Sequence, residues 1–421
     1  MRPDFPETVR AFLRIGLLSF GGPAGQIATM HRILVDEKRW LDEPRFLHAL
    51  NFCMLLPGPE AQQLVTYAGW LLHGVKGGLV AGLLFVLPGF VVMLGLAALY
   101  AGFTHVDFVQ GLFLGLKPAV LAVVVQAGLR IGARALKDMW ARGLALASFV
   151  AIFAVGLPFP LIVLAAGLAG WWRGRDGIVA RGAPAKVTTG TMGAMGTMGT
   201  VSLWLALWLA PVGLAWIHGH GAFAVIGLFF AKLAVVTFGG AYAALSYVAQ
   251  QAVESHGWLS AGEMLDGLGL AETTPGPLVL VNQFVGFLAG YRQPGDFNPW
   301  LGGVLGASLT VWVTFVPSFL WIFAGAPHVE RLRGHAALSS ALAAITAAVV
   351  GVIFNLALWF ALHVAFSRFD GFWPMWRTVQ PLSLVLAVAA MIAILRFKWG
   401  MVPVLTVCAA VGAGARQLGW A

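Results

Sequence analysis

Long runs of apolar residues separated by short polar stretches dominate the chain. The clearest runs are Gly78 to Phe103, Leu144 to Trp172, Val201 to Ile217, Leu301 to Ala324 and Pro381 to Leu395. A spanning helix needs ~20 apolar residues, so some runs cross a membrane once and others are long enough to fold back as two shorter helices. Continuous rather than alternating apolar positions favour helices over the strands of a barrel. We therefore predict an all-α polytopic membrane protein with about 10 to 13 membrane segments.

The composition agrees with this pattern and excludes an ordinary cytosolic enzyme. Hydrophobic residues make up 59% of the 421 positions and charged residues only 10%, against roughly 25% charged in a typical soluble domain. The net charge of +9 would suggest nucleic acid binding in a soluble chain. Here the basic residues lie in short loops between apolar runs, so they indicate membrane topology, and no nucleic-acid partner is expected. Cys53 and Cys408 are too few and too far apart for a disulfide framework or a metal site, and we expect no metal and no cofactor.

A basic, low-complexity segment divides the chain. Residues 173–200 contain four Lys or Arg residues followed by a Gly-, Thr- and Met-rich stretch, a composition typical of a flexible linker. It predicts an N-terminal transmembrane repeat at 1–172 and a C-terminal transmembrane repeat at 201–421.

The two parts are related in sequence. At an offset of 218 residues, residues 12–59 match residues 230–277 without gaps, with 12 identities among 48 positions. The identities include structure-breaking residues, because Phe20-Gly21-Gly22 falls on Phe238-Gly239-Gly240 and Pro57-Gly58-Pro59 falls on Pro275-Gly276-Pro277. Shared apolar composition alone does not align glycines and prolines. Gly/Pro-broken helices at corresponding places in two halves are typical of transporters that bind substrate at the repeat interface.

Loop charges favour inverted repeats. The loop from His31 to Arg45 contains four Lys or Arg residues, whereas its counterpart from Ala249 to Glu263 has none. The positive-inside rule therefore predicts that the two loops lie on opposite sides of the membrane. The same rule puts the linker and the loop from Arg130 to Arg142 on the cytoplasmic side.

The duplicated motifs resemble those of the chromate ion transporter family. Phe20-Gly21-Gly22-Pro23 and Leu56-Pro57-Gly58-Pro59 in the first half, with Phe238-Gly239-Gly240 and Thr274-Pro275-Gly276-Pro277 in the second, are similar to its long-chain members with two homologous halves. The resemblance implies a chromate exporter of the bacterial inner membrane that depends on the proton-motive force and confers chromate resistance. Two departures are Ala241, where the first half has Pro23, and Glu60 directly after the first Pro-Gly-Pro.

The breaks are the candidate substrate site. Helix N-termini offer unpaired N–H groups and a positive dipole end to an oxyanion, and proline suits the first helical turn. The candidate residues at the breaks are Gly21, Gly22, Gly58, Pro59, Gly239, Gly240, Gly276 and Pro277, together with the hydrogen-bond donors Thr274 and Asn282. The alternatives are that Pro-Gly-Pro only kinks packed helices and that the polar side chains only bridge them.

Charged residues in apolar segments are further candidates. Arg14 and Lys232 coincide under the 218-residue offset, and a basic residue in mid-membrane is costly enough to indicate a function. We expect this pair, with Lys117 as a secondary cation, to bind the anion; the alternative is that the long side chains reach the lipid headgroups. Glu60 and Glu272 beside the breaks are candidates for proton coupling, because burial favours the neutral carboxyl. Glu60 has the alternative role of stabilising a helix N-terminus.

Three functions are compared. The first is a secondary transporter that exports chromate, driven by the membrane potential, the proton gradient or both. The second is transport of another tetrahedral dianion such as sulfate by the same fold. The third is a membrane-embedded enzyme, which is disfavoured because no His-Glu-x-x-His or Gly-x-Ser-x-Gly motif is present. The expected partners are the oxyanion and the lipid bilayer, and a homodimer is left open.

Overall fold

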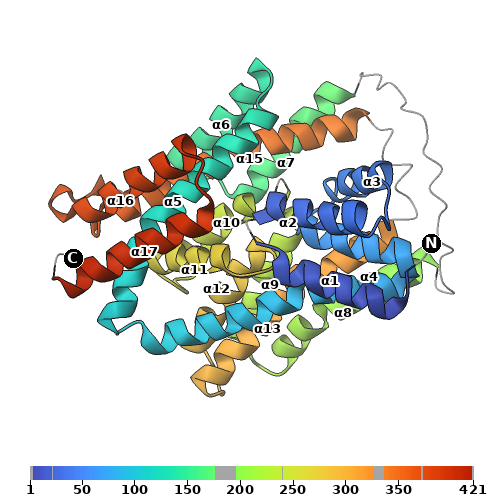
Figure 1. Ribbon diagram of the computed structural model, residues 1–421, viewed down its shortest axis with the longest axis horizontal. Coiled ribbons are helices and arrows are strands. Elements are labelled where there is room, and N and C mark those ends of the chain that lie inside the picture. Colours follow the sequence, from blue (N-terminus) through green and yellow to red (C-terminus); the bar gives the residue numbers. More distant parts are fainter. Residues whose placement is uncertain are drawn as a thin grey trace.

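The chain forms a bundle of helices of very different lengths (Figure 1). The structure is a computed structural model that describes residues 3–20, 22–175, 196–238, 240–325, 336–370 and 373–419. The first half contains α1 (Phe5–Leu18), α2 (Gly22–His31), η1 (Arg32–Glu37), α3 (Glu43–Cys53), α4 (Glu60–Phe103), α5 (Asp107–Ala135), α6 (Met139–Val155) and α7 (Phe159–Gly174). Helix α8 (Thr197–Ile217) begins inside the linker predicted at 173–200, and residues 176–195 of that linker lie outside the described residues.

The second half repeats the same order of elements. It contains α9 (Gly221–Val236), α10 (Ala241–Ala249), η2 (Gln250–Ser255), α11 (Ala261–Thr273), η3 (Leu278–Leu280), α12 (Val281–Arg292), α13 (Pro299–Gly325), α15 (Ala336–Ala365), β1 (Phe369–Asp370), β2 (Trp373–Pro374), η5 (Trp376–Thr378), α16 (Pro381–Met391), η6 (Ile392–Arg396) and α17 (Met401–Gln417). The two strands form a small antiparallel hairpin between α15 and α16.

The internal repeat is present in three dimensions. Shifting η1 by the 218-residue offset reproduces the bounds of η2, and α1, α2 and α3 likewise fall on α9, α10 and α11. Helix α4 loses helical geometry at His73 and Gly74, so its two segments correspond to α12 and α13. The remaining helices pack reciprocally, because α5 contacts α16 and α17 while α15 contacts α6 and α7. The prediction of two related repeats is confirmed.

The equivalent helices α4 and α13 cross at the centre of the molecule in opposite directions. A Cβ placed on Gly78 would lie 2.7 Å from the Phe323 ring, and one on Gly82 would lie 2.6 Å from the Phe319 ring. Moving forward along α4 therefore means moving backward along α13. Two equivalent helices that meet while running antiparallel require a twofold axis perpendicular to them, which is the geometry of inverted repeats.

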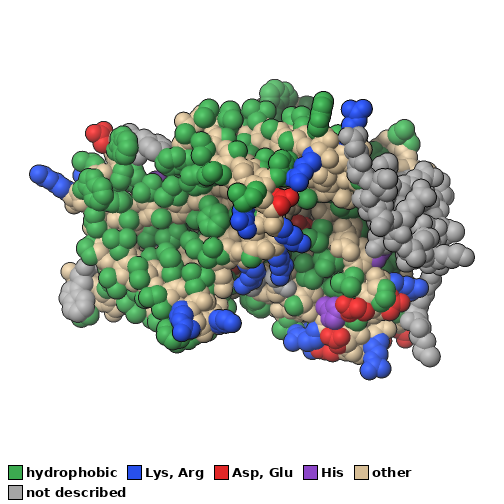
Figure 2. All heavy atoms as spheres, turned by 90° about the horizontal axis from the view of Figure 1, so that it is seen from above, with side chains coloured by type: hydrophobic (Ala, Val, Ile, Leu, Met, Phe, Trp, Pro, Cys, Tyr) green, Lys and Arg blue, Asp and Glu red, His purple; other side chains and the backbone are tan. Residues whose placement is uncertain are grey.

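The surface of the bundle suits a lipid environment. Within the described residues, five helices are long and apolar enough to cross a membrane, and five shorter helices are also apolar, in agreement with the expected number of segments. Large apolar side chains such as Leu83, Val91 and Leu168 are each more than half exposed. Figure 2 shows a face covered mostly by hydrophobic side chains, with charged side chains gathered in a few clusters. The chain is a multi-pass membrane protein.

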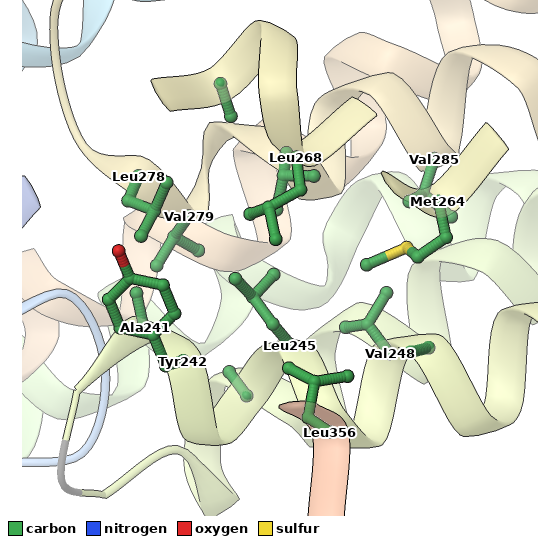
Figure 3. Close-up of a cluster of buried hydrophobic side chains, with 14 of the residues drawn as sticks. Ala241, Tyr242, Leu245, Val248, Met264, Leu268, Leu278, Val279, Val285 and Leu356 are labelled. Atoms are coloured by element: carbon green, nitrogen blue, oxygen red, sulfur yellow. The ribbon is translucent and has the colours of Figure 1, made fainter. Parts of the chain in front are cut away.

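Buried apolar side chains fix the short helices of the second repeat. Leu245 and Val248 of α10 pack toward Met264 and Leu268 of α11, and Leu356 of α15 closes the cluster from the far side (Figure 3). Tyr242 lies at its edge beside the segment that follows the second Pro-Gly-Pro. This packing holds the start of α12 in place.

Candidate functional site

The Gly/Pro motifs interrupt helices as the sequence predicts. Gly58 and Gly276, at the centres of the two Pro-Gly-Pro motifs, have φ angles of +110° and +92°, a left-handed region that favours glycine. Gly22 and Gly240 also have positive φ. Gly21 and Gly239, which we expected at the site, lie outside the described residues.

Each Pro-Gly-Pro break is bonded to the other repeat. The N–H of Gly58 donates to the carbonyl of Thr237 at 2.9 Å, and the N–H of Gly276 donates to the carbonyl of Ser19 at 2.8 Å. Ser19 and Thr237 are themselves equivalent, so the two bonds are copies of one another across the twofold axis. A further bond, from Gln26 Nε2 to the Gly276 carbonyl at 2.7 Å, has no copy, because Ala244 occupies the equivalent position. The breaks thus form a repeat interface, as expected for a substrate site.

The prolines stand one position earlier than expected. Pro59 is the N-cap of α4 and Pro277 is the N-cap of η3, so the helices begin at Glu60 and Leu278 rather than at the prolines. Neither helix start has a side-chain cap. Their first N–H groups therefore remain available to a ligand, since the first turn of a helix leaves its donors unpaired.

Buried polar side chains surround these helix starts. Gln62 and Gln63 follow the first break, Asn282 and Gln283 follow the second, and Thr310, Thr314 and Ser318 are spaced four residues apart along α13. All seven are buried, and each has a side-chain oxygen or nitrogen without a hydrogen-bond partner among the described residues. We call these seven residues the polar seam.

The polar seam reaches the break itself. A Cβ on Gly58 would lie 3.2 Å from Gln63 Nε2 and 3.8 Å from Ser318 Oγ. Both side-chain heteroatoms of Asn282 lack a partner among the described residues. An unpaired buried polar group costs ~1–3 kcal/mol, so these side chains are suited to hydrogen-bond water molecules or a ligand.

Thr274 is less available than we expected. Its Oγ1 donates to the Ala271 carbonyl at 2.9 Å, and the residue ends α11 as its C-cap. Its hydroxyl proton is therefore engaged within its own helix, while the hydroxyl oxygen can still accept a bond.

Arg14 and Lys232 lie on exposed apolar faces of their helices. The Arg14 side chain is 49% exposed and forms an ion pair of 2.6 Å with Glu37, and its neighbours Leu13 and Leu17 are also exposed. Lys232 is exposed, with Nζ 5.9 Å from the centre of the Tyr247 ring. We expected these equivalent cations to face a shared centre, but their positions match the alternative in which they reach the lipid interface. The repeat places Arg14 and Lys232 at equivalent positions on α1 and α9, but it does not bring their side chains to the breaks.

The candidate acids occupy different surroundings. Glu60 opens α4 at the first break and is partly exposed. Glu272 is buried at the end of α11, and its Oε1 accepts a hydrogen bond of 2.6 Å from the Tyr242 hydroxyl. Lys117 is not at a break. It lies 3.5 Å from Asp266, a buried carboxylate that the sequence analysis missed because nothing local marks it apart from its charge in an apolar helix.

Comparisons with known proteins agree with the duplicated motifs. A family model described as "Chromate transporter" matches residues 6–171 and 224–414, and the two matched regions start 218 positions apart, which is the offset of the internal repeat. The "Chromate transport protein" of Pseudomonas aeruginosa is 35% identical over 355 residues, which cover 83% of this chain and 79% of that protein.

Two further relatives extend the comparison. A "Chromate transport protein" of Cupriavidus metallidurans (strain CH34) is 27% identical, over 82% of this chain and 80% of its own length. An uncharacterized transporter of Bacillus subtilis (strain 168) is 30% identical over 141 residues, which cover 33% of this chain and 72% of that protein. No solved structure matches the chain.

Proposed function

The chain belongs to the chromate transporter family, and from this premise we propose that it exports chromate across the bacterial inner membrane as a secondary transporter. The observation that carries the proposal is the pair of equivalent bonds from Gly58 and Gly276 to the opposite repeat. They join uncapped helix starts and the polar seam at the interface between the repeats, which is where transporters with broken helices bind substrate.

Among the described residues, no Lys or Arg side chain is buried at the breaks, so other groups there must bind the oxyanion. Backbone N–H groups, hydroxyls and amides donate hydrogen bonds to oxygen, and the N-terminal dipole ends of α4 and η3–α12 favour negative charge. A tetrahedral dianion offers several acceptor oxygens, enough to satisfy donors that arrive from both repeats. Chromate is the first candidate because two relatives are named as chromate transport proteins.

Export is energetically accessible to such a protein. Moving a dianion out of a cell that is negative inside gains ~4.6 kcal/mol per 100 mV, or more than three decades of concentration. The membrane potential is therefore a sufficient driving force, and a proton gradient modifies it according to the sign of the coupling. We place the linker and the loop from Arg130 to Arg142 on the cytoplasmic side.

The function is tested with purified protein in proteoliposomes. We expect chromate flux to increase when the membrane potential favours movement of negative charge in the direction of transport. Sulfate should inhibit this flux if the hydrogen-bond donors recognise only the shape and charge of the anion. The potential and the pH gradient are imposed separately, and empty liposomes give the background. The direction of transport is tested with inside-out vesicles of a native membrane that contains the protein. Export from the cell appears there as chromate uptake into the vesicles. Chromate flux equal to that of empty liposomes under every gradient would contradict the proposal.

A further inference from the structure

A polar cavity lies away from the breaks. It has a volume of about 310 Å³, and its wall includes Tyr100 of α4, Lys117 of α5, Asp266 of α11 and Arg416 of α17. Helices of both repeats therefore build it. None of the residues of the two breaks or of the polar seam lines it.

Asp266 is the buried anionic group on this wall. Its side chain is 5% exposed, and its Oδ2 accepts a hydrogen bond of 2.9 Å from the Tyr100 hydroxyl. Lys117 Nζ lies 3.5 Å from the same oxygen, and Oδ1 has no hydrogen-bond partner among the described residues. An ionisable residue inside a membrane protein is expensive to retain and marks a functional site.

Lys117 lines the cavity beside this carboxylate. Its side chain is 29% exposed, whereas a charge-assisted N–H···O bond is normally ~2.7–2.9 Å long. The 3.5 Å separation therefore leaves the ammonium loosely held by Asp266. Gly262 makes room for it, since a Cβ there would lie 3.2 Å from Nζ.

The other charges near Asp266 are already paired. On its own helix Glu263 forms a 2.6 Å ion pair with Arg292 of α12. On the cavity wall Arg416 lies 3.2 Å from Asp107 of α5. Among these three ion pairs, the one between Asp266 and Lys117 has the longest N···O distance.

We propose that this cavity is an oxyanion site in which a proton on Asp266 and an anion on Lys117 bind together. While Asp266 is ionised, its charge neutralises Lys117. When Asp266 takes a proton from solution, the ammonium stays charged and faces the cavity with Arg416, and an oxyanion becomes its counter-ion. The carboxyl keeps its bond to Tyr100 in either state.

The proposal rests on the proposed function and adds the direction in which protons move relative to the transported oxyanion. Because the proton and the anion favour each other electrostatically, they are carried in the same direction. One proton moving with a dianion leaves a net negative charge, which the membrane potential still drives outward. A pH gradient that is alkaline inside then opposes export instead of driving it.

The first test measures proton uptake when chromate binds to the purified protein, followed with a pH-sensitive dye. The wild-type protein should take up protons on binding chromate, and Asp266→Asn, which is permanently neutral, should not. At alkaline pH Asp266→Asn should bind chromate about tenfold more tightly than wild type, which corresponds to ~1.4 kcal/mol. The protonation of chromate itself is common to all variants, so differences between them report the protein.

The second test removes the cation. Lys117→Met should weaken binding of chromate to this cavity, which is the binding linked to proton uptake, at least about tenfold. Because this change leaves Asp266 buried without its cation, the double variant Lys117→Met/Asp266→Asn provides a folded comparison that should also fail to bind tightly. Glu263→Gln, an acid on the same helix outside the cavity wall, is the matched control and should keep the wild-type proton uptake.

The outcomes separate this inference from the proposed function. Wild-type proton uptake by Asp266→Asn, or wild-type chromate affinity in the double variant, would overturn the inference while chromate flux by the wild type keeps the function. Chromate transport by the wild type with no proton uptake would also overturn it. Absence of any chromate flux by the wild type would contradict the function itself.

Discussion

Helices α1–α3 and α9–α11 follow the same backbone plan but place different side chains at equivalent positions. Asp266 lies where the first repeat has His48, Glu272 where it has Met54, and Leu278 where it has Glu60. The two bonds donated by the N–H groups of Gly58 and Gly276 use only backbone groups, so they survive these changes and appear twice, whereas the bond from Gln26 Nε2 appears once. Symmetry therefore belongs to the backbone, which can serve an anion from either side, whereas Glu60, Asp266 and Glu272 each have no acidic counterpart in the other repeat.

This difference separates two tasks. Two equivalent breaks related by a twofold axis allow the molecule to exchange an outward-open for an inward-open form with the same contacts. Asp266, a buried carboxylate without a counterpart in the first repeat, and Lys117 allow one proton-linked event for each cycle. The predictions below test first the symmetry and then the unequal side chains.

The largest expected effect concerns topology. With Cys53 and Cys408 replaced, single cysteines at Asp36 and Ser255, in the equivalent elements η1 and η2, should be labelled from opposite faces by a membrane-impermeant thiol reagent. Both positions are exposed, and inversion puts η1 and η2 on opposite sides. The measurement is labelling in right-side-out and inside-out vesicles. Labelling of both cysteines from one side only would refute the inverted arrangement.

The next effect concerns the symmetric breaks. Gly58→Leu and Gly276→Leu should each reduce chromate flux at least about 100-fold, equivalent to ~2.7 kcal/mol, because a side chain is strained at their positive φ angles and fills the interface. Flux is normalised to folded protein. Gly143→Leu is the matched control, since a Cβ there meets nothing within 4 Å.

Equal losses in the two break variants would mean that the breaks act as a pair. If one variant kept normal flux, the two breaks would not be functionally equivalent, even though their hydrogen bonds are. Normal flux in both would reduce the motifs to structural kinks.

A smaller and opposite pair of effects is expected at Asn282. Replacing this buried side chain by leucine removes two unpaired heteroatoms, so Asn282→Leu should increase the free energy of unfolding by up to ~1–3 kcal/mol while chromate flux falls about tenfold. Thermal unfolding and flux are measured on the same preparation. Thr346→Val is the control, because Thr346 Oγ1 already donates to the Leu342 carbonyl at 2.8 Å. Loss of stability together with flux would mean that Asn282 has a structural partner.

Much of the fold could be predicted because its signals are local or repeated. Continuous apolar runs predicted the spanning helices, and the run from Leu144 to Trp172 folds back as two helices, α6 and α7. Glycine and proline recur at a fixed offset, and those residues fix backbone geometry wherever they stand. The sequence alone therefore predicts the breaks at Gly58 and Gly276.

The polar contacts could not be predicted in the same way. Tyr100 and Lys117 lie on the consecutive helices α4 and α5, but Asp266 comes from α11, 166 positions after Tyr100, and no periodic pattern links the three residues. The alignment of Arg14 with Lys232 was correct, but alignment gives no direction for a side chain. Whether a residue faces lipid or the repeat interface depends on how the helices pack, and the 218-residue offset gives no information on packing.

The smallest expected effect concerns Arg14 and Lys232, whose side chains are exposed on the outside of the bundle. Arg14→Gln and Lys232→Gln should each leave chromate flux, normalised to folded protein, within about twofold of wild type, because an exposed ion pair is worth ~0–1 kcal/mol. Arg14 is engaged with Glu37 on the outside of the bundle, so its loss changes the helix end rather than the breaks. Glu37→Gln serves as the matched control and should reproduce the small effect of Arg14→Gln.

The amount of inserted protein is the readout that a lipid-facing cation should change, since it helps to set the depth of its helix. A severe fall in normalised flux in both Gln variants, with the corresponding Arg14→Lys and Lys232→Arg variants retaining flux, would show that the two cations do meet the anion during transport, and the equivalence of α1 and α9 would then extend from backbone to charge.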